Sequence, residues 1–332
     1  MHKILIVRFS SIGDIVLTTP VIRCVKQQLE KAEVHYLTKS AFAPILSANP
    51  HIDKLFAIDK DVSECIDDLR SENYDHVVDL HNNLRTAILK RGLKKPTTVL
   101  NKINFQKWLK VNFKIDRLPH THIVERCLKT VEKLGVVNDG QGLDYFIPNE
   151  DKVAISSLPY SHQNGYVGFV IGARHNTKRL PLAKIIAICK NLSKPVVLLG
   201  GKEDVQPAKE IAAAVGVHAY NACGKYNINQ SASLVQQSEK IITHDTGLMH
   251  VAAAFKKEII SIWGNTIPEF GMYPYLSDHG KNGVGKIMEV RDLECRPCTK
   301  LGFTTCPKGH FKCMEEIDES EIVKAVESPT PK

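Results

Sequence analysis

Apolar runs of four to six residues recur through the first half of the chain, as the buried strands of a parallel sheet require. We predict such strands at residues 3–8, 34–37, 54–58 and 76–80. Stretches with helical periodicity separate the strands, and helices are predicted at residues 18–30, 62–70 and 122–134. Because strands alternate with helices, this half is expected to fold as a doubly wound α/β domain.

The same pattern begins again after residues 138–159, a segment with glycine, aspartate and proline that we interpret as a linker. Strands are predicted at residues 167–172, 195–201, 240–243 and 258–264, and helices at 247–255 and 315–327. The chain is therefore expected to contain two facing Rossmann-like domains with a cleft between them, at residues 1–150 and 160–327. A length of 332 residues allows each domain to bury its own core.

An Asp245-Thr-Gly turn lies between a predicted strand and a predicted helix. The start of a helix presents free backbone N–H groups and the positive end of the helix dipole, and phosphate groups bind well there. His250 follows Gly247 by three residues and so lies on the same face of the helix, where it could contact the same anion. The alternative interpretation is that Asp245 or Thr246 only caps the helix and that His250 is a partly buried helix residue.

The turn after the first predicted strand carries a second candidate, Asp14. Ligands collect at the carboxyl ends of strands in this kind of fold, so the carboxylate of Asp14 could take part in binding or chemistry. The sequence Ser11-Ile-Gly-Asp14 also fits a capping box, in which Asp14 only caps the following helix. The two roles are compatible, because a carboxylate held by the turn can still face a ligand.

A net charge of +8 predicts an anionic partner such as a nucleotide, a phosphorylated glycolipid or an acidic membrane surface. No motif typical of nucleic-acid binding is present. Residues 90–114 contain many cations with Phe105, Trp108 and Phe113 between them, which indicates either a surface that touches an anionic membrane or a packed helix with a basic outer face.

Neither a signal sequence nor an apolar run of about 20 residues is visible. We therefore expect a cytoplasmic protein, at most peripheral on the cytoplasmic face of the inner membrane. Residues 280–287 nearly match a phosphate-binding loop but lack its final Ser or Thr, and a surface loop is expected there.

Four of the nine cysteines lie close together near the end of the sequence, beside His310. Thiolates at such spacings can hold a structural zinc ion, whereas disulfides are unusual in the cytoplasm. The alternatives are a regulatory redox pair and four unligated thiols. The zinc candidates are Cys295, Cys298, Cys306 and Cys313.

Two motifs resemble those of one known family. The stretch Asp245-Thr-Gly-Leu-Met-His250 resembles the donor-site signature of glycosyltransferase family 9, the ADP-heptose:lipopolysaccharide heptosyltransferases. Ser10-Ser-Ile-Gly-Asp14 resembles the N-terminal motif of that family. The resemblance covers nearly the whole chain and implies the GT-B fold. It also implies inverting, metal-independent transfer of a heptose or related sugar from an ADP-sugar to a lipopolysaccharide-core acceptor, with no cofactor required for catalysis.

The resemblance assigns roles to particular residues. Asp14 corresponds to the proposed catalytic base, and Lys178, in a Lys-Arg-x-Pro loop, corresponds to a lysine that holds the donor diphosphate. Leu180 stands where an aromatic residue is common in this loop, so a stacking contact there is not expected. The donor-binding residues implied are Lys178, Asp204, Asp245, Thr246, Gly247, Leu248 and His250, and the acceptor-binding residues are Ser10, Ser11 and Arg85.

Simpler interpretations exist for three of these residues. Lys178 could belong to an exposed basic loop, Arg85 could be a solvated helix residue, and Asp204 could only favour the start of a helix electrostatically. Two other functions also fit a fold of this type: a nucleotide-sugar epimerase, and a non-catalytic nucleotide-sugar binder. An epimerase would convert the donor without any acceptor, which separates it from a transferase.

Overall fold

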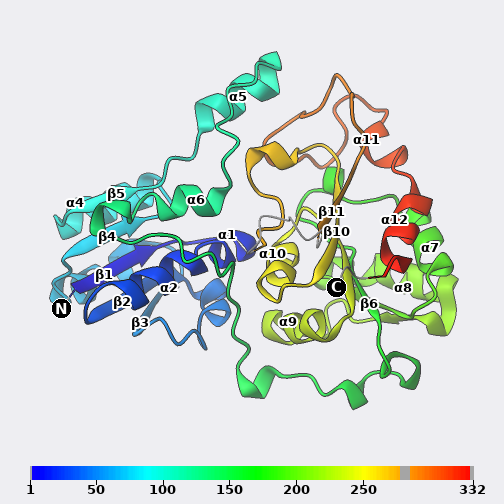
Figure 1. The fold of residues 1–332 in the computed structure, drawn as a ribbon, viewed down its shortest axis with the longest axis horizontal. Coiled ribbons are helices and arrows are strands. Elements are labelled where there is room, and N and C mark those ends of the chain that lie inside the picture. Colours follow the sequence, from blue (N-terminus) through cyan, green and yellow to red (C-terminus); the bar gives the residue numbers. More distant parts are fainter. Residues whose placement is uncertain (1, 277–284, 330–332) are drawn as a thin grey trace. The chain divides into compact units, whose positions relative to one another are not determined.

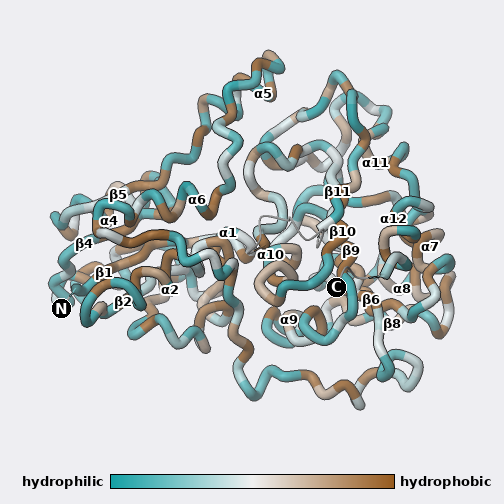
Figure 2. The backbone as a smooth tube through the Cα atoms, in the orientation of Figure 1, coloured by the Kyte–Doolittle hydropathy of each residue, from teal (hydrophilic) through white to brown (hydrophobic). Residues whose placement is uncertain are grey.

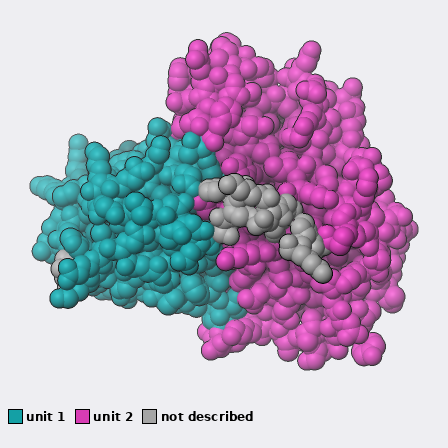
Figure 3. Space-filling model, viewed as in Figure 1, with its two compact units in different colours: residues 1–102, 121–148 teal, residues 103–120, 149–332 magenta. Residues whose placement is uncertain are grey.

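The computed structural model describes residues 2–276 and 285–329, and these residues fold into two compact units. Unit 1 comprises residues 1–102 and 121–148, and unit 2 comprises residues 103–120 and 149–332 (Figure 3). The surface loop expected at residues 280–287 lies mostly outside the described residues. No described helix is both long enough and apolar enough to cross a membrane.

Unit 1 contains a parallel five-stranded sheet in the order β3-β2-β1-β4-β5 (Figure 1). Its strands are β1 (His2–Val7), β2 (Ala32–Lys39), β3 (Lys54–Ile58), β4 (His76–Asp79) and β5 (Thr97–Val99). Its α-helices are α1 (Ile12–Val16), α2 (Thr19–Gln28), α3 (Ile66–Ser71), α4 (Leu84–Leu93) and α6 (Ile123–Leu128). The sequence pattern did not predict β5, because a three-residue edge strand carries too little periodicity.

Three helices predicted in unit 1 are shorter or more broken than expected. The helix predicted at residues 18–30 is α2, which begins after Thr18 and has Pro20 in its first turn, where the missing N–H of proline costs no hydrogen bond. The helix predicted at 62–70 consists of a short 3₁₀ turn followed by α3. The helix predicted at 122–134 ends at Leu128 and continues only as a 3₁₀ turn.

Unit 2 contains a parallel six-stranded sheet in the order β11-β10-β9-β6-β7-β8. Its strands are β6 (Val167–Val170), β7 (Val196–Leu199), β8 (Ala219–Asn221), β9 (Lys240–His244), β10 (Glu258–Trp263) and β11 (Gly285–Glu289). Its α-helices are α5 (Asn104–Phe113), α7 (Leu182–Asn191), α8 (Val205–Val215), α9 (Ile228–Gln237), α10 (Gly247–Ala254), α11 (Lys312–Glu315) and α12 (Glu319–Glu327). Two Rossmann-like α/β units are thus present, as the sequence predicts.

The central strands are mostly apolar and buried because helices cover both faces of each sheet. Ile4 to Val7 of β1 are buried, as are the six residues of β10. Figure 2 shows hydrophobic stretches of the backbone in the sheets of both units. Each sheet reverses its strand order at one point, between β1 and β4 in unit 1 and between β6 and β9 in unit 2. In open α/β sheets, ligands bind outside the carboxyl ends of the strands at this point.

The segment at residues 103–120 differs from the sequence-based expectation. The predicted first domain spans residues 1–150, whereas this segment groups with unit 2. Ile103 and Leu118, at its two ends, are buried against Ile267 and Phe270. No residue of α5 is fully buried, but Val111 packs against this small core, so α5 is attached on one side while its aromatic side chains stay exposed.

Arg23 on α2 provides a test of what holds unit 1 together. The guanidinium group is buried and donates to Asp139 at 2.7 and 2.8 Å, to Asp144, and to the backbone oxygen of Gly142 at 2.9 Å. We predict that Arg23→Met lowers the free energy of unfolding of unit 1 by about 3–5 kcal/mol, because it leaves two carboxylates without their partner. Urea titration combined with hydrogen exchange of the β1 and β2 amides measures this change.

The matched control is Arg70→Met, which removes an exposed arginine whose partner is Asp67, at 2.8 Å. Exposed ion pairs contribute at most about 1 kcal/mol, so little change is expected. Equal effects of the two substitutions would contradict a supporting role for the buried network.

Candidate functional site

Asp14 lies just beyond the carboxyl end of β1, in the first turn of α1. Its Oδ2 accepts hydrogen bonds from the Ser11 hydroxyl at 2.8 Å and from the Ser11 backbone N–H at 3.2 Å. Its Oδ1 lies 2.8 Å from Nη2 of Arg8, and 26% of its side chain is exposed. The capping interaction expected from the sequence is therefore present, and part of the carboxylate still faces outward.

Arg8 is the residue of this site that sequence reasoning missed. Besides its ion pair with Asp14, it donates through Nε to the backbone oxygen of Ser10 at 2.7 Å and through Nη1 to that of Leu80 at 2.6 Å. Arg8 thus links the loops that follow β1 and β4. The available signal was a cation that ends a buried strand, where a charged group needs partners.

The surroundings of Asp14 favour its ionised form. Burial raises the pKa of the carboxyl, but the positive charge of Arg8 and the hydrogen bonds from Ser11 outweigh this effect. The net result is a pKa below the ordinary value of an aspartate. Asp14 is therefore a carboxylate at neutral pH, which is the form that can accept a proton.

The loop after β4 contributes polar groups beside this position. Asp79 is fully buried, pairs with Lys90 at 3.0 Å, and accepts the backbone N–H groups of His81 and Asn82 at 3.0 and 2.7 Å. Burial is the main cause that lowers the pKa of His81 to about 4, and the charge of Arg8 adds to it. The ring of His81 packs edge-on against Phe9 and is neutral at neutral pH.

The acceptor-binding residues expected from the resemblance all lie in unit 1, at this end of the sheet. Ser10 and Ser11 form the turn between β1 and α1, where Ser11 is exposed. Arg85 lies in the first turn of α4, with 42% of its side chain exposed and Nε 4.0 Å from Oδ1 of Asp61. This arrangement leaves the guanidinium group of Arg85 accessible, and its role as an acceptor contact stays a prediction.

In unit 2, Lys178 and Asp245 come together from the loops that follow β6 and β9. The ammonium group of Lys178 forms an ion pair with Asp245, and both side chains are mostly buried. The same carboxylate oxygen accepts a hydrogen bond from Thr266, at 3.0 Å, in the loop after β10. Lys178 is thus held at the strand-order reversal and does not belong to a freely exposed basic loop.

The turn at Asp245–Leu248 is partly exposed, whereas the helix behind it is not. Thr246 is the N-cap of α10 and has extended backbone, and its side chain makes no capping hydrogen bond. The first backbone N–H groups of α10 therefore have no partner within the helix and can bind an anion. His250 is buried in the second turn, below this surface.

Arg179 and His244 hold the loop that carries Lys178 in place. Arg179 donates to the backbone oxygen of Ala173 and pairs with Asp204 at 3.0 Å. His244 is buried, which lowers the pKa of its imidazole to about 4, and its Nε2 accepts the backbone N–H of Leu180 at 3.0 Å. Leu180 itself is a core residue.

Asp204 is the candidate whose place differs most from what its proposed role requires. Only 2% of it is exposed, and its carboxylate accepts the backbone N–H of Gly201 at 2.9 Å and pairs with Arg179. A Cβ atom at Gly172 would lie 2.0 Å from Oδ2 of Asp204, so glycine is required there. Asp204 therefore supports two loops, and its role in donor binding stays a prediction.

Asn265, directly after β10, is a second residue that sequence reasoning did not assign. It is 2% exposed, and neither polar atom of its side-chain amide has a hydrogen-bond partner among the described residues. An unsatisfied buried amide costs about 1–3 kcal/mol, which a ligand or water would offset. Asn265 precedes Thr266, the partner of Asp245, and so lies in the same loop as the candidate donor site.

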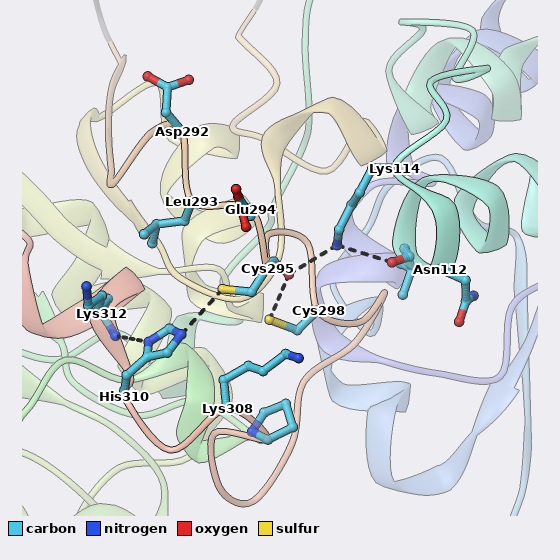
Figure 4. A pocket seen from close by; sticks show the side chains of 12 residues that line it. Asn112, Lys114, Asp292, Leu293, Glu294, Cys295, Cys298, Lys308, His310 and Lys312 are labelled. Atoms are coloured by element: carbon cyan, nitrogen blue, oxygen red, sulfur yellow. Dashed lines mark hydrogen bonds between the residues drawn. The ribbon is translucent and has the colours of Figure 1, made fainter.

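Cys295 and Cys298, two of the four C-terminal cysteines, line a separate pocket of about 690 Å³ in unit 2, between the end of α5 and the loop at residues 292–312 (Figure 4). Nε2 of His310 is 3.8 Å from Sγ of Cys295, and Sγ of Cys298 donates to the backbone oxygen of Cys295 at 3.1 Å. Nδ1 of His310 accepts the backbone N–H of Lys312, so a neutral ring carries its proton on Nε2.

This arrangement does not gather the expected zinc ligands. Among the described residues, no three of these thiol and imidazole groups have ligand atoms within 4.8 Å of one another. The group that meets this distance is Glu33, His35 and Glu72, and Lys3 pairs with both of its carboxylates. Zinc at Cys295, Cys298, Cys306 and Cys313 stays a prediction that metal analysis of the protein can test.

Comparison with known proteins gives consistent results. The model of glycosyltransferase family 9 (heptosyltransferase) matches residues 62–298. Lipopolysaccharide heptosyltransferase 1 of Campylobacter coli is 25% identical over 349 residues, which cover 98% of this chain and 98% of that protein.

Two solved structures share the fold. The glycosyl transferase family 9 protein from Veillonella parvula DSM 2008 has a TM-score of 0.76 and 23% identity, over 98% of this chain and 96% of that chain. E. coli ADP-heptose lps heptosyltransferase II has a TM-score of 0.73 and 20% identity, over 98% of this chain and 97% of that chain.

The family match covers more than half of the chain, and the full-length relative and the shared fold agree with it. The resemblance seen in two short motifs is therefore confirmed. The chain belongs to glycosyltransferase family 9, the heptosyltransferases, and is a glycosyltransferase.

Proposed function

We propose that this glycosyltransferase moves a heptose from ADP-heptose to a sugar of the lipopolysaccharide core, with inversion and without a catalytic metal. The observation that carries the proposal is the state of Asp14: a carboxylate kept ionised by Arg8 and Ser11, with a quarter of its side chain exposed at the strand-order reversal of unit 1. A general base needs this combination of charge and access.

In this mechanism Asp14 accepts the proton of the acceptor hydroxyl while the hydroxyl oxygen attacks the anomeric carbon of the donor. The bond between that carbon and the diphosphate oxygen breaks on the opposite face, so the configuration inverts. The developing negative charge on ADP requires stabilisation by groups that are already in place. Lys178 and the first backbone N–H groups of α10, at Thr246 and Gly247, would supply it.

The ion pair of Lys178 with Asp245 supports this assignment of the donor site. Asp245, whose carboxylate also accepts a hydrogen bond from Thr266, holds the ammonium group of Lys178, so a diphosphate that binds at the start of α10 would meet a positioned cation. Leu248 and His250 complete the motif, and we assign His250 to its support because it is buried. An ADP-heptose donor is consistent with E. coli ADP-heptose lps heptosyltransferase II, which shares the fold.

The acceptor would bind to unit 1 through Ser10, Ser11 and Arg85. An accessible guanidinium group can bind a phosphate or carboxylate of the core with two parallel hydrogen bonds.

Incubation of ADP-heptose with the protein alone separates this function from an epimerase: the sugar should remain unchanged until a core acceptor is added.

The first prediction from this mechanism concerns the base. Asp14→Asn should reduce turnover by at least about 10²-fold, because the amide cannot accept the proton, while ADP affinity stays near the wild-type value. A coupled assay of ADP release and calorimetry of ADP binding give the two numbers. The control is Asp318→Asn, which changes the exposed capping aspartate of α12, away from the proposed site residues, and should retain activity.

The second prediction concerns Arg8 and the pH profile. Loss of the Arg8 charge raises the pKa of Asp14, so Arg8→Met should move the acid limb of kcat/KM to higher pH, because Asp14 must be ionised to act. Arg8→Lys keeps the charge and should move it less. Identical acid limbs in the Met variant and the wild type would argue against Asp14 as the base.

The third prediction concerns the donor site. Lys178→Ala should weaken ADP binding by about tenfold to 10²-fold, the usual effect of a lost hydrogen bond to a charged group. The neighbouring Asp245 would also lose its partner and repel the diphosphate. Arg174→Ala, an exposed cation of the same loop, is the control in calorimetry. Unchanged affinity in the Lys178 variant would remove this residue from the donor site.

A further inference from the structure

Helix α5 presents large aromatic side chains to solvent. Phe105, Trp108 and Phe113 are 66%, 50% and 58% exposed, and none of the residues of α5 is buried. Trp108 stacks on Phe105 with ring centroids 6.1 Å apart and meets Phe113 edge-on at 5.2 Å. The three rings therefore form one continuous apolar surface, which we call the aromatic patch. Such patches on soluble proteins usually mark interaction sites.

The segment that carries the aromatic patch is firmly attached to unit 2. Ile103 and Leu118 pack into a small core, and the ammonium group of Lys107 lies over the ring of Phe270, 5.4 Å from its centroid. At the end of α5, Lys114 donates to the backbone oxygens of Cys295 and Pro297 at 3.1 and 2.8 Å. The exposure of the rings is thus a property of an anchored segment.

The segment that carries the aromatic patch is rich in cations. Residues 103–120 contain Lys107, Lys110, Lys114 and Arg117 against a single carboxylate, Asp116. Asp116 pairs with Lys110 at 2.9 Å. Lys308 and Lys312 line the same pocket as Lys114, where Asp292 and Glu294 partly offset their charge (Figure 4). An apolar centre with a positive rim is complementary to an anionic surface that offers an apolar interior.

We propose that the aromatic patch of α5 and its lysines bind an anionic phospholipid bilayer. The rings would enter the boundary between headgroups and acyl chains, and the lysines would contact the anionic headgroups. This inference deepens the proposed function and rests on it. A lipopolysaccharide-core acceptor that is anchored in a membrane must be reached at the membrane surface.

A bilayer fits these observations better than a protein partner. A stable protein interface buries about 800 Å² on each side, more than three rings on a ten-residue helix can supply. Pairing of this surface with the same surface of a second copy would bring like charges together, and their repulsion would oppose a dimer. A bilayer needs no complementary shape and provides both the apolar interior and the negative charge.

The chain contains two tryptophans, which makes the test specific. Trp263 is buried in β10, so a change of fluorescence on addition of vesicles reports on Trp108. We expect a blue shift, and quenching by brominated acyl chains, with vesicles of phosphatidylethanolamine and phosphatidylglycerol. Vesicles of phosphatidylcholine alone should give neither.

Cosedimentation with the same anionic vesicles measures affinity. The variant with Phe105→Ser, Trp108→Ser and Phe113→Ser should bind at least tenfold more weakly than the wild type, and Lys107→Gln with Lys110→Gln should also bind more weakly. The matched control is Tyr160→Ser with Val217→Ser, which removes two exposed apolar side chains elsewhere in unit 2 and should bind normally. The aromatic and control positions are exposed, so the melting temperatures of those variants should change little. Lys107 and Lys110 are partly buried, so the melting temperature of the double lysine variant is measured beside its vesicle binding.

Three results would overturn the proposal: no binding to anionic vesicles, equal binding of the aromatic variant and the wild type, or a dimer in sedimentation velocity that the aromatic variant loses. None of these readouts requires turnover. Absence of vesicle binding by the wild type, together with the expected loss of turnover in Asp14→Asn, would reject the membrane surface alone. Vesicle binding by the wild type, together with unchanged turnover in Asp14→Asn, would reject only the catalytic assignment.

Discussion

The strand-order reversal in each parallel sheet is the constraint on which the candidate site depends. β1 and β4 in unit 1, and β6 and β9 in unit 2, are neighbours whose following connections leave in opposite directions along the sheet. Right-handed crossovers place the helices of such connections on opposite faces, which opens space at the carboxyl ends of the two strands. Asp14 and Lys178 both lie at these positions, although 163 residues of sequence separate them.

Each candidate charge at these positions is matched by an opposite charge. Arg8 holds Asp14, and Asp245 holds Lys178. A charged group that is partly removed from water needs such a partner, and the partner also sets which form is present and where it points. For Asp14 this means an ionised carboxylate of limited basicity, and for Lys178 a cation positioned beside the start of α10.

Segment 103–120 shows that chain order and structural grouping can differ. The segment interrupts unit 1 in sequence, yet its end residues pack in unit 2. Its Lys114 donates to the backbone oxygens of Cys295 and Pro297. Its helix buries none of its own residues, so packing within unit 2 does not explain its aromatic side chains. The proposed contact with an anionic bilayer would account for the exposure of these side chains.

The sequence by itself determined the α/β class and most of the strands, because a strand buried on both faces must be apolar along its length. It also determined the two family motifs, whose residues are neighbours in the chain. Only the tertiary structure decided the role of Arg8, whose partner Leu80 is 72 residues away, and the isolation of the Asn265 amide. The supporting role of Asp204, the grouping of segment 103–120 and the spacing of the cysteine thiols were decided in the same way. Contacts between residues far apart in sequence leave no local periodicity, so packing alone reveals them.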